Sequence, residues 1–555
     1  MQRKTKNIIA AVTLTGLLAL TAATMYLSKS NTKVTSNQLE APPNNSSDTN
    51  NAQSSNSSNA VPPNGNSPSM PNGSIKGNMP RTKHTKILPT GYYVAFGAES
   101  LSIALVVVYL IISKGNKKTF KEVMGNKDRV VAGILAAILM TAGESYVTKH
   151  YLVNIENGHL AQRNTTNASS STTVTSTKTV NNASSTKSDE SAVLVKSGGK
   201  ATITGKVTKS GDATNTESSE FNGVNAAILV QKNGTATIKN ATIQTTGKAS
   251  NAVFASGSSS KITITNSTIT TTGSSGARGL DATYGGTIVG KNLKVTTQGA
   301  SSAALATDRG EGSVTVDHST LETNGKGSPV IYSTGKITLT NSKGNANGSQ
   351  NVVVEGKNSA TITNSTLSAS GVGNRNNVDN AGVMLYQSMS GDAGNGTANF
   401  TSTNSTLSIR STSSVYKSAP MFFVTNTSAI VNLKNTTLNF GSGILMSIKA
   451  TSEWGNNGHN GGNVTLNADS QTLNGAINLD KLSTLTFNLK NGSKYTGQIN
   501  SDQSAKSVKL TLDASSKTTL TGDTYVSSLE DADSTYSNIN FNGYKLYVNG
   551  KALNA

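Results

Sequence analysis

Alternating apolar and polar residues recur along the C-terminal two-thirds of the chain at a nearly constant spacing. The clearest copy is Lys261 to Gly273, KITITNSTITTTG, where Ile262 and Ile264 alternate with threonines as far as Asn266. Such alternation predicts a strand with one buried face. Beyond the asparagine the phase changes, because Ile269 follows it by three residues rather than two. The pattern therefore predicts two short strands joined at a corner.

The corner position can be followed through successive copies, with steps of 26, 26, 26, 23 and 23 residues before longer insertions. Its members are Asn240, Asn266, Asn292, His318, Asn341, Asn364, Asn404 and Asn435. A second apolar run precedes each copy by roughly ten residues. Repeats of about 20 to 50 residues indicate a solenoid, propeller or array, but a propeller blade needs four strands and about 40 residues. The spacing thus predicts an all-β chain folded as a parallel β-helix.

Stacking in register places like residues over like, so the corner asparagines are expected to form a structural ladder. Asn240, Asn266 and Asn292 would point inward and hydrogen-bond amide to amide, because buried polar groups require partners. His318 interrupts the row. We favour an amide substitute in the ladder for this residue; the alternatives are a metal ligand or a general base.

Composition agrees with a thin core. The 555 residues are only 34% hydrophobic and include no cysteine, which excludes disulfides and thiolate metal sites. The formal charge is +19. No block of Lys and Arg marks a nucleic-acid footprint in the repeats, so anionic wall or surface polymers are the more reasonable partners.

The N-terminal region predicts attachment to a membrane. Residues 1–27 have a basic start and an apolar run, as in a signal peptide or a retained membrane anchor. Residues 28–90 are rich in Asn, Ser and Pro, which predicts a disordered linker. Residues 91–148 predict two transmembrane helices. Glu99 and Glu144 in these segments either form an ion site or, as we favour, lie near an interface or pair between helices.

Charge between the two apolar segments sets the predicted topology. Residues 114–129 form a tight basic loop, which the positive-inside rule places in the cytoplasm. The protein would then be a multi-pass protein of the cell membrane with its C-terminal domain outside the cell. Residues 161–190 are rich in Ser, Thr and Asn and predict a stalk, followed by the β-helix with a C-terminal cap over 192–555.

Specific segments carry a family resemblance. They include GLDATYGG at 279–286, AALATDRGEG at 303–312 and VMLYQSMSGDA at 383–393. Together with the asparagine row, they resemble the pectate-lyase-like superfold of right-handed parallel β-helices, and more narrowly the adhesin-like β-helix proteins of bacterial surfaces, over about 192–550. The resemblance implies adhesion or another surface interaction, with a surface glycan or a protein of a host or neighbouring cell as partner. It carries no catalytic residue set.

One charged cluster is the strongest candidate for a ligand site. Asp281 and Asp308 lie 27 residues apart, about one coil, so both carboxylates should emerge on the same face roughly 5 Å apart. Close carboxylates shift each other's pKa or share a cation such as Ca²⁺. The competing interpretation, which we favour, is a surface ion network that holds two turns together. The candidate ligand-binding residues are Arg278, Asp281, Tyr284, Asp308, Arg309, Glu311 and Tyr386.

Signatures of enzymes are missing from the sequence. No HExxH zinc motif, phosphate-binding loop or repeated GGxGxD calcium motif occurs. We therefore expect no catalysis, no resident cofactor and no catalytic residue. The alternative function is an extracellular polysaccharide-binding or polysaccharide lyase-like protein that uses the acidic and tyrosine-bearing face. Tyr332, Tyr386, Phe422 and Phe423 could give that face a small stacking platform, although for the two phenylalanines we favour a packing role in the core or at the surface.

Overall fold

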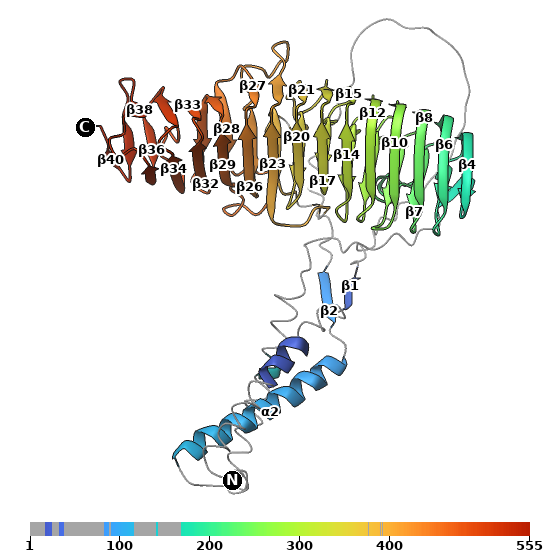
Figure 1. The fold of residues 1–555 in the computed structure, drawn as a ribbon, viewed down its shortest axis with the longest axis horizontal. Coiled ribbons are helices and arrows are strands. Elements are labelled where there is room, and N and C mark those ends of the chain that lie inside the picture. Colours follow the sequence, from blue (N-terminus) through green and yellow to red (C-terminus); the bar gives the residue numbers. More distant parts are fainter. Residues whose placement is uncertain are drawn as a thin grey trace, which may run out of the picture. The chain divides into compact units, whose positions relative to one another are not determined.

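The structure is a computed structural model that describes residues 17–24, 33–37, 83–87, 90–115, 140–142 and 168–554, except 376, 389 and 391. The chain divides into two compact units, Met1–Ile155 and Glu156–Ala555. Figure 1 shows the stacked strands of the second unit, ordered along the chain from β4 to β40.

The described part of the first unit is mainly helical. Helix α2 spans Thr90–Gly115, and residues 17–24 and 140–142 are also helical. Strands β1 (Lys33–Asn37) and β2 (Lys83–Ile87) pair antiparallel within the range predicted as a linker. In these described segments, no helix combines the length and the apolar character that crossing a membrane requires.

Other predictions for this unit fall on residues outside the described ranges. They are the basic loop at 114–129 beyond Gly115 and the second apolar segment apart from residues 140–142. Glu99 is described, and its Oε1 accepts a hydrogen bond of 2.6 Å from the Thr24 hydroxyl. Glu144 lies outside the described residues.

One strand per coil builds the first sheet of the second unit, in which twelve parallel strands are described. These strands are β3 (Ser169–Val174), β5 (Glu190–Val195), β7 (Ile228–Gln231), β9 (Val253–Ser256), β11 (Leu280–Thr283), β13 (Leu305–Asp308), β16 (Ile331–Ser333), β19 (Val352–Glu355), β22 (Val383–Tyr386), β25 (Phe422–Thr425), β28 (Ile444–Ile448) and β31 (Ala476–Leu479). They arise from the second apolar run of each repeat.

The alternating segments build a second set of parallel strands. It begins with five long strands, β4 (Thr177–Ser185), β6 (Lys200–Lys209), β8 (Thr235–Thr245), β10 (Lys261–Thr271) and β12 (Thr287–Thr297). It continues in shorter strands, which are β14 (Ser313–Asp317), β15 (Thr320–Thr323), β17 (Lys336–Thr340), β18 (Lys343–Ala346), β20 (Ser359–Thr363), β21 (Thr366–Ala369), β23 (Thr397–Thr403), β24 (Thr406–Ile409), β26 (Ser428–Lys434), β27 (Thr437–Asn439), β29 (Asn463–Asp469), β32 (Thr484–Lys490), β34 (Ser507–Leu512) and β37 (Ser528–Asp531).

Two small sheets occupy the C-terminal end. The first consists of β30 (Thr472–Asn474), β33 (Lys494–Gly497), β35 (Lys517–Leu520) and β38 (Ile539–Asn540). The second consists of β36 (Thr524–Val526), β39 (Leu546–Val548) and β40 (Lys551–Ala552). Because β40 runs antiparallel to β39, it ends the parallel stacking and covers the edge of β39. The described strands thus form long parallel sheets, consistent with a β-helical solenoid.

The register places the apolar residues of successive coils over one another. Ile238 pairs with Ile264, and Ile262 pairs with Ile288, and all four side chains are buried in a single core that runs along the stack. Polar residues, mainly threonines and lysines, alternate with them on the outer face of β8, β10 and β12, apart from the exposed Val289. The period-2 alternation in the sequence therefore reports directly which side chains enter the core.

The asparagine row lies at the corner between two strand segments, as the phase change predicts. All eight members have positive φ angles, between 46° and 55°. Asn adopts this left-handed conformation more readily than most residues, which explains its recurrence. The side chains are exposed, so the predicted inward orientation is wrong. Amide-to-amide hydrogen bonds nevertheless join Asn292 Nδ2 to Asn266 Oδ1 (3.0 Å) and Asn435 Nδ2 to Asn404 Oδ1 (3.0 Å).

At His318 the ladder changes its chemistry. His318 Nδ1 lies 2.7 Å from Asp317 Oδ2, and Asn341 Nδ2 donates to Asp317 Oδ1 at 2.8 Å. The carboxylate of Asp317 thus links the two rungs that a corner amide joins elsewhere.

The solenoid begins earlier than the sequence predicts. Strands β3 and β4 lie within 161–190, the range predicted as a stalk, and they pair in parallel with β5 and β6. Val174 and Val180 supply their buried apolar side chains. This first coil is inconspicuous in the sequence because serine and threonine fill most of its strand positions.

Candidate functional site

The outer face of the twelve-stranded sheet is partly covered by loops and one short helix. Helix α5 (Thr216–Asn222) is specified locally, because the Asn215 side chain accepts a hydrogen bond from Ser218 N–H and Gly223 ends the helix with φ 68°. Residues of α5 and of later loops, among them Asn374, Asp379, Asp392 and Trp454, line a cleft of about 430 Å³.

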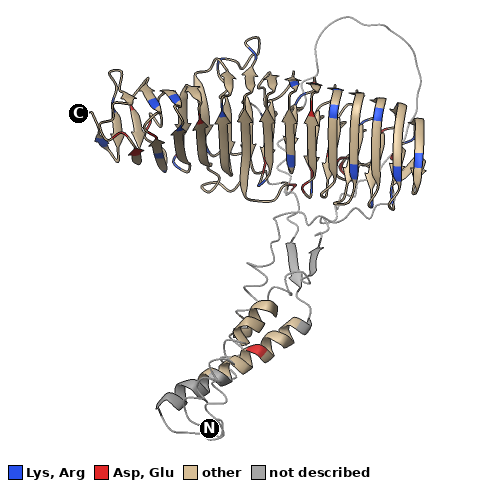
Figure 2. Cartoon of the chain, viewed as in Figure 1, with Lys and Arg blue, Asp and Glu red and all other residues tan. Residues whose placement is uncertain are grey.

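Carboxylates outnumber cationic groups in the lining of this cleft. The acidic residues that line it are Glu220, Asp308, Glu355, Asp379 and Asp392. Arg278 and Arg375 are its basic residues, and Tyr332, Tyr386 and Trp454 supply aromatic rings. Basic residues are found elsewhere on the solenoid: Figure 2 shows Lys and Arg residues on the strands of the N-terminal coils.

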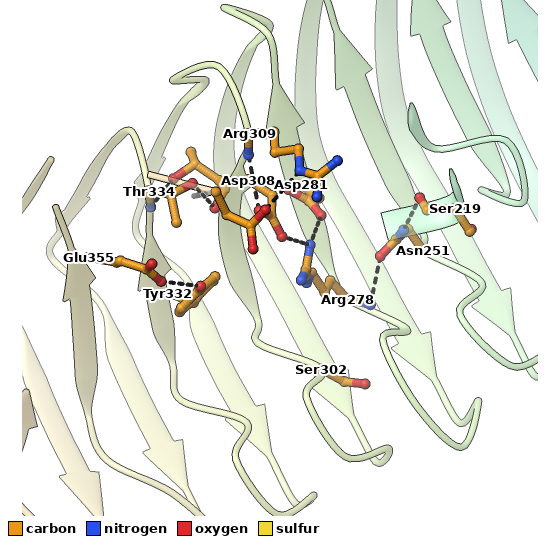
Figure 3. A network of polar contacts seen from close by, with 12 residues as sticks. Ser219, Asn251, Arg278, Asp281, Ser302, Asp308, Arg309, Tyr332, Thr334 and Glu355 are labelled. Atoms are coloured by element: carbon orange, nitrogen blue, oxygen red, sulfur yellow. Dashed lines mark hydrogen bonds and ion pairs between the residues drawn. The ribbon is translucent and has the colours of Figure 1, made fainter. Parts of the chain in front are cut away.

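Arg278 joins the two aspartates that the coil spacing brought together. Its Nη1 lies 2.7 Å from Asp281 Oδ2 and 2.8 Å from Asp308 Oδ2 (Figure 3). The local register pairs Thr283 with Asp308, so the aspartates lie on the same face but two positions apart along neighbouring strands. All three side chains are buried, with at most 6% of each residue exposed. The network is therefore internal rather than the surface ion network we favoured.

One guanidinium cannot neutralise two carboxylates, and the pKa values reflect this. Burial raises the pKa of Asp281. Burial, reinforced by Asp392 and Asp281, raises the pKa of Asp308 to about 8 against the opposing effect of Arg278. At neutral pH the pair therefore retains a proton, which leaves one positive and one negative charge in the network.

The retained proton predicts a pH dependence of stability. A carboxyl group whose pKa is raised by folding binds more protons in the folded state, so stability falls as pH rises from about 4 to about 8. In Asp308→Asn the amide imitates the neutral carboxyl group, and we expect a smaller fall in Tm between pH 5 and 8 than in the wild type. Circular dichroism melting curves over this range measure the difference.

Asp513→Asn is the matched control. Desolvation opposes the shift there, but hydrogen bonds from Asn491 N–H and from Ser515 and Ser516 lower the pKa of Asp513 to about 2. Its stabilisation is present above pH 4 and lost as pH falls toward 2, so the slope between pH 5 and 8 should not change. An Asp308→Asn slope equal to that of the wild type would contradict the shared proton.

A second buried carboxylate lies two strands from Asp308. Glu355 is 1% exposed, and its Oε2 accepts a hydrogen bond of 2.8 Å from Tyr332 (Figure 3). The Tyr386 hydroxyl donates a second hydrogen bond of 2.8 Å to the same oxygen. Its Oε1 has no hydrogen-bond partner among the described residues. Burial raises the pKa of Glu355. The Tyr386 ring also contacts the Trp454 ring edge to face, with the two ring centroids 5.2 Å apart.

The predicted candidates divide into two groups. Arg278, Asp308 and Tyr386 line the cleft, and Asp281 lies against Arg278. Tyr284, Arg309 and Glu311 do not line it.

Two of these outer candidates stabilise the surroundings of the cleft. Arg309 bonds Asp392 (2.8 Å) and Glu217 (3.1 Å) and stacks on Phe221 of α5, which fixes the helix beside the cleft. Glu311 forms an ion pair with Lys357 at 2.7 Å.

The candidate set predicted from the sequence lacks Glu355 and Trp454, and it includes Tyr332 only as part of the alternative stacking platform. Asp308 follows Thr307, which pairs with Ser333, and Ser333 pairs with Val354, the residue before Glu355. The two carboxylates thus lie in one row, about 10 Å apart at the backbone. Following the strand register instead of the distance in sequence would have found Glu355. Phe422 packs in the main core, and Phe423 packs in an outer cluster with Trp454, which agrees with the packing role that we favoured for both.

Metal binding has no arrangement to support it in the part of the chain that the structure describes. No group of three or more His, Asp or Glu side chains there has the geometry of a metal site.

The chain matches no model of a known protein family and no curated protein sequence. The cleft is therefore assigned from its geometry alone.

Proposed function

We propose that this is a membrane-anchored, adhesin-like protein of the cell surface whose right-handed β-helix binds carbohydrate through the cleft. One observation carries the proposal: aromatic rings and carboxylates converge in a concave site on an otherwise regular outer face. Saccharide sites combine apolar ring faces, which cover sugar C–H groups, with a few fixed polar groups that select hydroxyls.

The construction of the cleft suits recognition of a ligand. Arg278 and Glu355 are held in place by two ion pairs and two tyrosine hydroxyls respectively, so neither needs to reorganise when a ligand binds. Polar side chains such as Ser301, Ser349 and Gln350 also line the site and offer hydrogen bonds to hydroxyl groups. The site is thus preformed.

Binding is favoured over lyase chemistry by the state of Arg278, which lines the cleft. A lyase needs a basic side chain to abstract a proton from the sugar. Arg278 is engaged by Asp281 and Asp308. Although burial opposes the shift, these two carboxylates raise the pKa of Arg278, so its guanidinium has no access to the neutral form that a base requires.

The cell-surface part of the proposal rests on the N-terminal sequence. The apolar runs within 1–27 and 91–148 would anchor the chain, and the basic loop at 114–129 would stay in the cytoplasm. The solenoid would then face outward, where its lysine-bearing strands meet anionic surface polymers and its cleft meets a glycan.

A glycan array with the purified full-length protein tests carbohydrate binding. We expect selective signals that are lost in Tyr386→Ala, because this change removes an aromatic wall and one hydrogen bond to Glu355. Tyr544→Ala, at an exposed tyrosine outside the cleft, should bind as the wild type does. No signal from protein shown to be folded would contradict the proposal. Formation of unsaturated uronides in a parallel assay would instead favour a lyase.

A further inference from the structure

We propose that the glycan bound in the cleft carries free, non-acetylated amino groups, and that Glu355 binds one of them as an ammonium ion. The proposal rests on the function proposed above and specifies the ligand class of the same site. Three features of the cleft lead to it: an unsatisfied carboxylate oxygen, an excess of acidic groups, and aromatic rings beside them.

The unsatisfied oxygen is the first feature. Glu355 lines the cleft although it is 1% exposed, and both tyrosine hydroxyls that contact it bond to Oε2. Among the described residues, no donor has the geometry of a hydrogen bond to Oε1, although the Ser388 hydroxyl lies near enough to the carboxylate to oppose the rise of its pKa that burial causes. A buried acceptor without a donor raises the free energy of the unliganded protein. A ligand that donates an N–H group to Oε1 removes this cost and therefore binds more tightly. An ammonium group supplies up to three such donors.

The charge balance is the second feature. Asp308 shares Arg278 with Asp281, and Asp392 is paired with Arg309. In the described part of the chain, Glu220 and Glu355 form no ion pair. The Asp379 carboxylate accepts hydrogen bonds from the backbone N–H groups of Asn374 and Arg375. The carboxyl groups of Glu220, Glu355 and Asp379 thus face one further lining cation, Arg375.

The acidic character of the cleft is local, because the chain as a whole carries a formal charge of +19. A cationic group on the ligand would offset the excess of carboxylates, whereas a uronate would add to it. An acidic glycan is therefore disfavoured in the cleft, although it suits the lysine-bearing strands outside.

The aromatic rings are the third feature. Tyr332 and Tyr386 hold Glu355 from two sides, and Trp454 continues the wall beyond Tyr386. Aromatic faces attract cations and also cover the C–H faces of sugar rings. Serine, asparagine and glutamine side chains around them provide for hydroxyl groups. An amino sugar satisfies all of these requirements, whereas a simple amine would leave the hydroxyl-binding groups unused.

Titration calorimetry of the full-length protein tests the proposal with three β-1,4-linked tetramers of matched length: glucosamine, N-acetylglucosamine and glucose. We expect the glucosamine tetramer to bind at least about tenfold more tightly than either neutral tetramer. The reason is that only its ammonium group can form a hydrogen bond between charged groups with Glu355. In Glu355→Gln this preference should fall to less than about threefold, because the amide still accepts the two tyrosine hydrogen bonds but carries no charge.

Glu311→Gln is the matched control, since its carboxylate pairs with Lys357 and does not line the cleft. It should keep the full preference. Equal binding of all three tetramers would overturn the amino-sugar inference and leave carbohydrate binding intact. Binding of a lysine-rich peptide but of no tetramer would overturn both proposals. The comparison of tetramers uses the unaltered protein, so it decides the question even if Glu355→Gln does not fold.

Discussion

Replacement of Arg278 by alanine is expected to lower the free energy of unfolding by about 3 to 5 kcal/mol. The reason is that Asp281 and Asp308 would remain buried, at 0% and 3% exposure, without their shared counter-charge. Each coil of a solenoid is stabilised mainly by its neighbours, so the loss would be concentrated around β11 and β13. Urea denaturation followed by circular dichroism should show an earlier transition or a separate phase for these coils.

Two further variants make the expectation specific. The triple variant Arg278→Ala/Asp281→Asn/Asp308→Asn replaces both carboxyl groups by neutral amides, so no buried charge is left unpaired, and it should recover much of the lost stability. Lys509→Ala breaks an ion pair with Glu530 in which both side chains are exposed, and should cost less than about 1 kcal/mol. If Arg278→Ala unfolds at the urea concentration of the wild type, the buried network does not stabilise these coils.

Gly325→Ala is expected to have the second large effect, a loss of about 1 to 3 kcal/mol or more. Gly273, Gly299 and Gly325 occupy equivalent positions in consecutive coils, and they are the glycines that close the repeats in the sequence. A methyl group on Gly325 would overlap the carbonyl oxygen of Gly299. Because the obstacle is backbone, relief requires the coils to separate, which weakens the hydrogen bonds between them.

Gly492→Asn is the appropriate control for this experiment. A Cβ at Gly492 would meet no atom within 4 Å, and asparagine tolerates its φ of 75° better than other residues do. Thermal melts of Gly325→Ala and Gly492→Asn should therefore differ by several degrees, with the first lower. Equal melting temperatures would mean that the coils are spaced more widely at the glycine column than the structure indicates.

Much of the fold could be predicted because the alternation of apolar and polar residues in each repeat indicates the strands, their buried faces and the corner between them. The stretch from Lys261 to Thr271 predicts a strand with a corner at Asn266, and β10 has both. The direction of the asparagines could not be predicted from alternation, since a residue in the left-handed conformation leaves the pleat and turns outward. The first coil was missed because its strands, from Ser169 to Ser185, contain few apolar side chains beyond Val174 and Val180.

The candidate site was predictable only where coil length is regular. Asp281 and Asp308 could be associated because they lie on adjacent coils of similar length. Glu355 could be associated with them only by following the strand register from coil to coil. Trp454 could not, because it lies in a long loop between β28, which ends at Ile448, and β29, which begins at Asn463. Glu311 shows that nearness in sequence can also suggest a site residue wrongly. It lies near Arg309 in sequence, but β13 ends at Asp308, and the carboxylate of Glu311 pairs with Lys357 instead.

The fluorescence of Trp454 tests the central claim most directly, because this is the single tryptophan of the chain and it lines the cleft. Titration of the full-length protein with the glycan selected on the array should change the intensity or the emission maximum of Trp454 and reach saturation. The same titration of Tyr386→Ala should show no saturable change. Glycan binding detected by calorimetry with unchanged Trp454 fluorescence would place the ligand elsewhere on the solenoid and contradict the assignment of the cleft.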